Sequence, residues 1–220
     1  MNGTVESRNV GAGAPAKKGV PHAGISTAGG EPHAPRASAR ERLLAAAGEL
    51  FYEEGINTVG IDRVIERAGV AKASLYSAFG SKDELIRAYL AERHATRQRR
   101  VGETLLKHAT PRDKLLGLFD YLGDIMAESG FRGCAFVRAG AELRSSSSAK
   151  SVCDESRSWM KNLFEQLAAE AGATHPQQLA QQLALLYDGA VVAAQMDHDA
   201  SAAQAARATA AALLDAAGAK

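Results

Sequence analysis

Helical periodicity, interrupted at short intervals by caps and glycines, runs from Ser38 to the end of the sequence. Apolar residues recur three and four positions apart, which places them on one face of an α-helix, and no alternating strand pattern or hairpin dipeptide competes. Alanine, the strongest helix former, is abundant, whereas aromatic residues make up only 5% of the chain. The sequence therefore predicts an all-α fold.

Helix caps and glycines mark where the predicted helices begin and end. Ser38 with Glu41 and Ser81 with Glu84 have the spacing of a capping box, and Thr110 precedes a proline at a first helical position. The expected helices lie approximately between residues 38 and 55, 61 and 68, 72 and 79, 81 and 107, 110 and 130, 134 and 143, 149 and 172, 174 and 197, and 201 and 216.

Two caps are predicted in the second half of the chain. The polar run Ser145–Ser148 is expected to form a loop that caps the helix after it. Thr174, Pro176 and Gln177 combine a cap, a first-turn proline and a capping-box glutamine, which predicts the start of the next helix.

The formal net charge of the 220 residues is +1, which argues against a protein that coats nucleic acid. It leaves DNA binding open, because charge can be concentrated locally. Residues 37–110 carry 12 basic and 10 acidic side chains, whereas residues 111–220 carry 10 and 13. The basic excess therefore lies in the first half of the chain.

Residues 1–36 contain four of the six prolines and seven of the 21 glycines, with no aromatic residue. Such a segment buries too little apolar surface to offset its ordering entropy, so we predict a disordered, mildly basic tail. A loose DNA contact and a passive extension are both open interpretations of it.

The stretch Ile61–Lys82 carries the clearest functional signal. Two short helices joined by a turn that contains Gly69 predict a helix-turn-helix, in which Val64, Val70 and Leu75 form an apolar wedge between the helices. Residues 63–82 hold four basic side chains and one acidic side chain, so the segment is locally positive. This combination favours DNA as a partner.

The same stretch resembles the TetR family of transcriptional regulators, over residues 38–90. The resemblance is carried by Ala68-Gly69-Val70, Leu75-Tyr76, Phe79, Ser81-Lys82-Asp83-Glu84-Leu85, Leu50-Phe51 and Gly55, and more weakly by Gly133-Cys134 and Ala141-Glu142-Leu143. It implies a helix-turn-helix DNA-binding domain over residues 37–82 and a helical ligand-binding and dimerisation domain over residues 83–220.

The resemblance also implies roles for residues of the second helix of the motif and for Lys82 at the start of the following helix. Tyr76 and Lys82 would contact phosphates, Lys82 together with the N-terminus of its own helix. A half-buried core position for Tyr76 is the alternative. The side chains expected nearest the base edges in the major groove, or alternatively only solvated, are Lys72, Ala73, Ser74 and Ser77.

Two residues depart from the family pattern. Ala71 stands where the family often has serine, which removes a helix cap and a phosphate donor. Ile65 stands where a small residue is usual, and we expect it to shift the packing angle between the helices slightly. With Ala71 and Ala73 at the start of the second helix, DNA shape and contacts with thymine methyl groups are expected to contribute to recognition.

The second domain is expected to contain a ligand pocket and a dimer interface. Ordinary packing within one chain is the alternative explanation for both sets of residues. The pocket is predicted between helices that carry Phe119, Met126, Phe136, Trp159, Phe164 and Tyr187. The dimer seam is predicted along Leu179, Leu183, Leu186 and Ala190 on one helix and Ala206, Ala210 and Leu213 on the next.

Three other features have a functional and a plain interpretation. One predicted helix carries Arg93, Arg97 and Arg100 on one face, with Arg99 beside them. This face is either a second DNA contact or a solvated or inter-domain face. The triplet 197–199 is a metal patch or a loop at a helix end, and we favour the loop. Cys134 and Cys153 are redox sensors or inert packing, and we favour packing.

No catalytic motif, phosphate-binding glycine loop or long apolar span occurs in the sequence. We therefore predict a cytoplasmic protein that is not an enzyme and has no cofactor, metal or membrane partner. The expected function is that of a homodimeric repressor, which binds double-stranded DNA at a pseudo-palindromic operator and is released by an unknown small-molecule effector. The alternatives are a ligand-independent activator and a helical small-molecule-binding module with little specific DNA binding.

Overall fold

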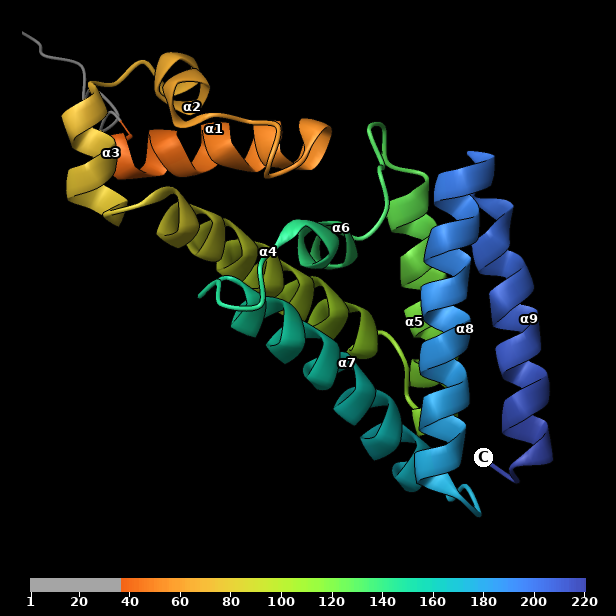
Figure 1. The fold of residues 1–220 in the computed structure, drawn as a ribbon. Helices are drawn as coiled ribbons and strands as arrows, with labels where there is room; N and C mark the ends of the chain where they lie inside the picture. Colours follow the sequence, from red (N-terminus) through yellow and green to blue (C-terminus); the bar gives the residue numbers. More distant parts are fainter. Residues whose placement is uncertain (1–36) are drawn as a thin grey trace, which may run out of the picture. The chain divides into compact units, whose positions relative to one another are not determined.

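The computed structural model describes residues 37–220, and the predicted tail of residues 1–36 lies outside the described part. Every regular element in residues 37–220 is an α-helix, which confirms the predicted fold class (Figure 1). The helices are α1 (Ala39–Glu54), α2 (Ile61–Ala68), α3 (Lys72–Phe79), α4 (Lys82–Leu105), α5 (Pro111–Met126), α6 (Ala135–Glu142), α7 (Lys150–Glu170), α8 (Pro176–Asp197) and α9 (Ser201–Ala216).

Local capping explains the best-predicted helix boundaries. Ser38 and Glu41 form both halves of the capping box before α1. Ser81 accepts a hydrogen bond from the backbone N–H of Glu84, which forms one half of the box expected before α4. Thr110 caps α5 through the backbone N–H of Asp113, at 3.0 Å.

One predicted helix end and two predicted caps are wrong. The helix α5 ends at Met126 with Ala127 as its cap, and does not extend to Gly130. Ala149 is the N-cap of α7 and offers no capping side chain, while the Ser147 hydroxyl accepts from the Ala149 backbone N–H at 3.1 Å. The N-cap of α8 is His175, while the hydroxyl of Thr174 donates instead to the carbonyl of Ala217, at 3.3 Å.

The serine run between α6 and α7 attaches this loop to the start of α4. The carboxylate of Asp83 accepts hydrogen bonds from the Ser147 hydroxyl at 2.5 Å and from the Ser148 hydroxyl at 2.7 Å. The Ser148 backbone N–H donates to the same carboxylate at 3.0 Å. These bonds to the charged form hold the pKa of Asp83 below its usual value, the Ser147 bond first among them.

Two apolar cores hold residues 37–220 together. The first joins α1, α2 and α3 to the beginning of α4, around Leu43, Phe51 and Leu75, and also receives Ala139 of α6 and Val152 of α7. Thus the core around the first three helices continues beyond residue 82, and the domain boundary stays a prediction. The second core fills the space between α5, α7, α8 and α9 and includes the end of α4.

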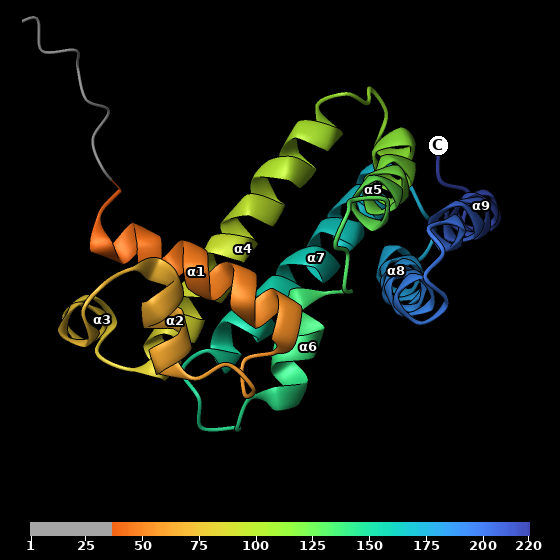
Figure 2. The same cartoon turned by 90° about the horizontal axis from the view of Figure 1, so that it is seen from above.

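The long helix α4 passes from one core to the other. It packs against α1 and α3 at its beginning, against α7 along its length and against α5 toward its end (Figure 2). The helices α8 and α9 lie side by side, packed against α7 and α5 respectively. The continuous helix α4 therefore connects the two cores.

The predicted dimer seam is wrong in its residues, because most of them lie in the core of the single chain. The relative exposure of Leu179, Leu183, Ala190, Ala206 and Ala210 is at most 6%. Leu186 and Leu213 are partly buried against the same core. The apolar stripes predicted from the sequence therefore belong to the core of the single chain. This was the alternative interpretation, which the spacing of the residues did not exclude.

Candidate DNA-binding surface and effector cavity

The turn between α2 and α3 has the left-handed geometry that the sequence predicted. Gly69 adopts φ 62° and ψ 44°, a conformation that side chains with a Cβ disfavour. Its backbone N–H donates to the carbonyl of Glu66 at 3.1 Å. The guanidinium of Arg42 on α1 donates to the carbonyl of Gly69 at 3.2 Å, which ties the turn to the first helix.

The predicted wedge between α2 and α3 is present. Val64 and Leu75 are 1% and 0% exposed, and Val70 is partly buried against the same core. Because Leu75 points inward, the residues before and after it are turned outward: Ala73, Tyr76 and Ser77 are exposed. The second helix of the motif therefore presents one free face.

The predicted DNA-contacting residues lie on or beside this face. Lys72 is exposed and Ser74 is partly buried, whereas Tyr76 is 47% exposed, which is too open for a core position. Lys82 lies at the start of α4 and is partly buried. Burial lowers the pKa of Lys82, while the nearby carboxylate of Glu142 acts in the opposite direction. These positions suit the predicted roles without testing them.

Ala71 is the N-cap residue of α3 and supplies no side-chain hydrogen bond. Its extended backbone, with φ −75° and ψ 150°, is the conformation in which a serine would cap the helix. The missing cap expected from the sequence is therefore real, and the first N–H groups of α3 are left without a side-chain acceptor.

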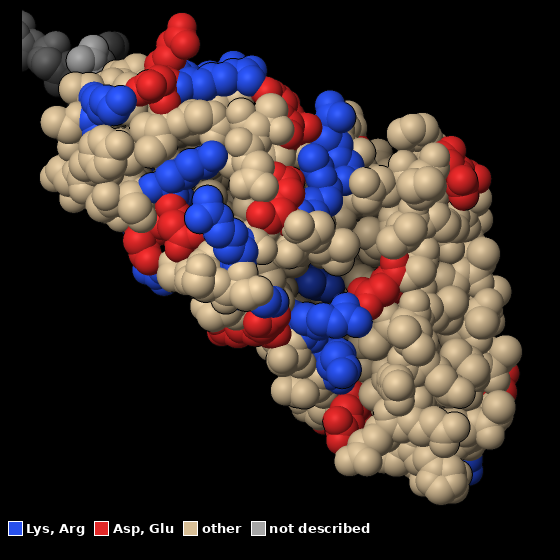
Figure 3. Space-filling model, in the orientation of Figure 1, with Lys and Arg blue, Asp and Glu red and all other residues tan. Residues whose placement is uncertain are grey.

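Most of the positive charge around the motif is compensated by acidic neighbours. Lys72 pairs with Asp62 at 2.9 Å, Arg67 pairs with Glu49 at 2.7 Å, and Arg63 pairs with Glu54. Figure 3 shows the result, with blue and red side chains interleaved over the helices near the described N-terminus. The local count of residues 63–82 missed this compensation, because all three acids lie outside that segment. Glu49 and Glu54 lie on α1, and only the fold brings them near the motif.

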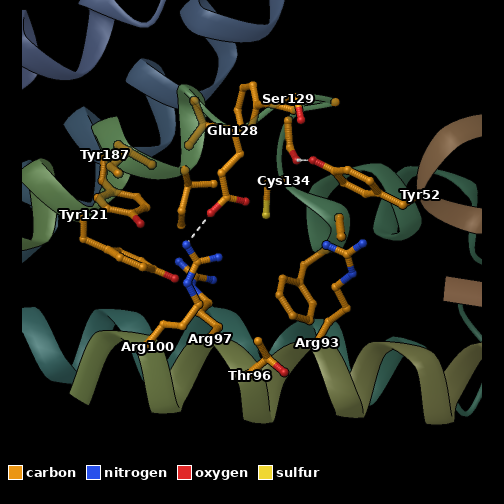
Figure 4. A pocket seen from close by; sticks show the side chains of 18 residues that line it. Tyr52, Arg93, Thr96, Arg97, Arg100, Tyr121, Glu128, Ser129, Cys134 and Tyr187 are labelled. Carbon is orange, nitrogen blue, oxygen red and sulfur yellow. Dashed lines mark hydrogen bonds and ion pairs between the residues drawn. The ribbon is translucent and has the colours of Figure 1, made fainter. Parts of the chain in front are cut away.

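Two adjoining cavities lie beyond the motif, between α4, α5, α6, α7 and α8. Their volumes are about 290 Å³ and about 380 Å³. Both walls include Arg97 of α4, Cys134 before α6, Phe136 of α6, and Tyr187 and Val191 of α8. Figure 4 shows the first cavity, with Arg93, Arg97 and Arg100 rising from α4 toward the aromatic rings.

The residues predicted for a pocket divide into two groups. Phe136 and Tyr187 line both cavities, and Phe164 lines the larger one. The other three lie outside both walls: Phe119 packs on Phe164 and Tyr187 in the core, Met126 is 7% exposed in the same core, and Trp159 stacks edge-on against His94.

Burial perturbs the titrating groups near these cavities. It raises the pKa of Tyr187 to about 12 and the pKa of Cys153 to about 11, so that both stay protonated at neutral pH. His94 is 6% exposed and neither ring nitrogen has a hydrogen-bond partner among the described residues. Burial lowers the pKa of His94, which keeps the imidazole neutral.

The sequence interpretation missed the arginines of α4 as cavity residues. Their spacing placed Arg93, Arg97 and Arg100 on one helix face, but it did not show what that face meets. In the structure this face lines the smaller cavity together with residues of α5 and α6 and of α8, and the three arginines are partly buried. Cys134, which was expected to be inert packing, also lies in both cavity walls and is only partly buried.

The helix α6 connects the cavities to the N-terminal helices. Beside the cavity end of α6, the carbonyl of Gly133 accepts a hydrogen bond from the Tyr52 hydroxyl at 3.1 Å. Arg138 donates to the backbone carbonyl of Tyr52 at 2.5 Å, and Glu142 accepts from the backbone N–H of Asn57 at 2.8 Å. A displacement of α6 would therefore move the end of α1.

Neither the metal hypothesis nor a membrane segment finds a basis in the described residues. No cluster of three His, Cys, Asp or Glu side chains suited to a metal occurs within residues 37–220. Asp199 binds the backbone N–H of Ser201 at 2.8 Å, as a residue at a helix start does. Within the same range, no helix has the length and apolar character needed to cross a bilayer.

Similarity to known proteins agrees with this architecture. The family model of bacterial regulatory proteins of the tetR family matches residues 43–89, from α1 into α4. The crystal structure of a TetR-type transcriptional regulator from Streptomyces avermitilis is 34% identical, with a TM-score of 0.75, over 84% of this chain and 100% of that one.

Two curated relatives match over shorter segments. The transcriptional activator FasR of Mycolicibacterium smegmatis is 47% identical over 60 residues, which are 27% of each chain. The transcriptional repressor NemR of Escherichia coli is 29% identical over 106 residues, 47% of this chain and 53% of NemR. The matched segments thus span about a quarter of the length of FasR and about half of the length of NemR.

A helix-turn-helix with a free second helix, continued by a long helix into a cavity-containing helical domain, defines a DNA-binding regulator of transcription. The similarity to the Streptomyces avermitilis structure covers the full length of that structure and not only the helix-turn-helix. This chain belongs to the TetR family of bacterial regulatory proteins, whose members are transcriptional regulators and not enzymes.

Proposed function

We propose that the protein is a repressor that binds a pseudo-palindromic operator as a homodimer and leaves it when a small molecule enters the cavities beside α4. One observation carries the proposal: α4 starts at Lys82, beside the recognition helix α3, and its middle turns line both cavities. A ligand that shifts α4 would reposition Lys82 and, through the first core, α3. Release requires the ligand to favour the conformation that fits the operator less well.

In this proposal the DNA contacts divide into two kinds. Tyr76 and Lys82 bind phosphates and position the motif, while Lys72, Ala73, Ser74 and Ser77 lie nearest the base edges. The ion pair with Asp62 limits the free charge of Lys72. Long-range attraction to DNA is therefore modest, and affinity depends on dimer geometry and short-range contacts.

A different surface from the predicted seam supports the homodimer. On α8, Leu185, Val192 and Met196 are 62%, 52% and 73% exposed and lie on one helix face, since their spacings are seven and four residues. Exposed alanines lie on one face of the neighbouring helix α9: Ala205, Ala208, Ala212 and Ala216. We propose a two-fold dimer through α8 and α9; to bind two half-sites one helical turn apart, its recognition helices must lie about 34–36 Å apart.

An activator is the second candidate, because FasR, an activator, is 47% identical over 60 residues, about a quarter of this chain. NemR, a repressor, matches a longer segment of 106 residues, at 29% identity. Transcription from the bound promoter, measured with purified polymerase, separates the two: a repressor lowers the transcript yield and an activator raises it.

Footprinting of the DNA that flanks the gene tests the proposal directly. A ligand-released repressor dimer should protect two half-sites related by a dyad, one helical turn or a multiple of it apart. Binding should weaken steeply as salt rises. If no flanking sequence competes better than random DNA at moderate salt, the repressor proposal fails and a small-molecule-binding module without specific DNA binding replaces it.

A further inference from the structure

The charges in the two cavity walls do not balance. The walls contain six basic and three acidic side chains. Each acid already forms an ion pair with one of the bases, so none is free to receive a cationic ligand. The pairs are Arg100 with Glu128, Lys150 with Asp154 at 3.2 Å, and Arg157 with Asp188 at 2.7 Å.

Arg97 is the basic residue that both cavities share and that has no carboxylate within ion-pair distance in residues 37–220. Its guanidinium lies 5.9 Å from the ring centres of Phe136 and Tyr187. It donates a long hydrogen bond, 3.4 Å, to the hydroxyl of the fully buried Ser156. A guanidinium has five N–H donors, so most of its donor capacity is unused.

The other two unpaired bases are less suited to anchor a ligand. The guanidinium of Arg93 lies 4.2 Å from the ring centre of Tyr52 and 5.6 Å from that of Tyr89, so it is held against aromatic rings at closer range than Arg97. Lys161 is exposed at the wall of the larger cavity alone. Figure 4 shows Arg97 aimed into the space between Tyr121, Tyr187 and Cys134.

The rest of the walls is apolar and aromatic. Phe136, Tyr187 and Val191 border both cavities, Phe131 borders the smaller one and Met160 the larger one. The volumes of about 290 Å³ and about 380 Å³ suit a small organic molecule. An unpaired guanidinium among apolar walls favours a ligand with one anionic head group and an apolar body, since a neutral ligand would leave the charge uncompensated.

We infer that the ligand of these cavities is an organic anion, whose carboxylate, sulfonate or phosphate binds the Arg97 guanidinium while its apolar, preferably aromatic, body lies against Phe136 and Tyr187. Binding itself is independent of the proposed function, whereas its regulatory consequence, release from DNA, rests on that function. Arg97 lies four turns along α4 from Lys82.

A matched pair of fluorescent probes tests the inference. 1-Anilinonaphthalene-8-sulfonate and N-phenyl-1-naphthylamine share one aromatic body and differ in the sulfonate. Each is titrated into the intact protein and into Arg97→Gln, Arg97→Lys and Arg99→Gln. Arg99 is the control, because it lies exposed on the same helix and outside both walls.

The unchanged protein should bind the sulfonate at one site and more tightly than the neutral amine. Arg97→Gln should weaken sulfonate binding about tenfold or more, the size of one charge-assisted hydrogen bond, and leave amine binding within about twofold. Arg97→Lys should keep part of the affinity, and Arg99→Gln all of it. Higher salt should weaken the sulfonate alone.

Equal affinity of the unchanged protein for the two probes would overturn the inference, as would an equal loss of both in Arg97→Gln. The first comparison needs no variant, so it holds even where a variant fails to fold. Fluorescence anisotropy of operator DNA is measured in parallel. Arg97-dependent sulfonate binding without any change in anisotropy would contradict ligand release and leave the anion site standing.

Discussion

At the residue scale, substitution of Lys82 tests most directly whether the proposed surface contacts DNA phosphates. It lies at the start of α4, where free backbone N–H groups and the helix dipole also favour an anion. We expect Lys82→Ala to weaken binding to all DNA sequences alike and to reduce the slope of log affinity against log salt by about 1. Lys72→Ala should instead change the base preference.

The measurement is a competition assay with operator and random DNA at several salt concentrations. Lys107→Ala is a suitable control, because Lys107 is exposed beyond the opposite end of α4. An unchanged affinity and salt slope in Lys82→Ala would refute the phosphate contact.

His94 makes a second prediction at this scale, on stability against pH. Burial lowers its pKa in the folded protein below the ordinary 6.5, with Arg97 acting in the same direction and Glu155 against it. Between the two pKa values the unfolded chain therefore binds more protons, so the unfolding free energy falls as pH drops below about 6.5. Replacement by phenylalanine should flatten this part of the curve.

Urea unfolding at pH 7.5, 6.5 and 5.5 measures the effect. The ring contacts with Phe136 and Trp159 allow an aromatic replacement, and Trp159, the single tryptophan, reports unfolding at the same place. Identical pH dependence in both proteins would show that another group titrates. Asp83, whose pKa is lowered, acts in a different window, below about its ordinary 3.8.

At the element scale, the uncapped start of α3 is open to improvement. Ala71→Ser should add a cap at a position that already has the extended backbone a cap requires, and raise the unfolding free energy by about 1 kcal/mol. Thermal unfolding with and without the change measures this. Ala73→Ser, two residues further on and inside α3, is the matched control and should give no gain in stability. Equal effects of the two substitutions would contradict capping.

The tie between α4 and the α6–α7 loop is a second element-scale feature. Asp83→Asn keeps the shape of the side chain but weakens the bonds from Ser147 and Ser148, which are charge-assisted. We expect a loss of about 1–2 kcal/mol in unfolding free energy at neutral pH. The difference from the unchanged protein should shrink as pH falls and the Asp83 carboxylate is protonated. A difference that is constant down to pH 3 would contradict this.

At the scale of the whole molecule, the exposed apolar face of α8 predicts self-association. Val192→Glu should place a charge in the proposed interface and convert a dimer to a monomer, with a loss of operator affinity. Light scattering during size-exclusion chromatography measures the mass. Asn162→Glu, at an exposed site of α7, is the control. A monomeric unchanged protein would refute the dimer proposal.

Local sequence signals predicted the helices and the motif well because caps, glycines and spacing act over a few residues. The bounds of α2 and α3, the left-handed Gly69 and the missing cap at Ala71 all follow from such signals. The serine run was misassigned because its partner, Asp83, is more than sixty residues away in sequence. A loop rich in hydroxyls looks the same whether it caps the next helix or bonds to a distant one.

The sequence by itself determined the all-α class, the helix-turn-helix and the outward face of α3, since each depends on neighbours within one or two turns. Only the tertiary structure decided which apolar stripes are core, which cations are already paired, and that Arg97 lines both cavities. The physical reason is that periodicity defines a helix face but not what covers it. Burial and charge compensation depend on helices brought together from distant parts of the chain.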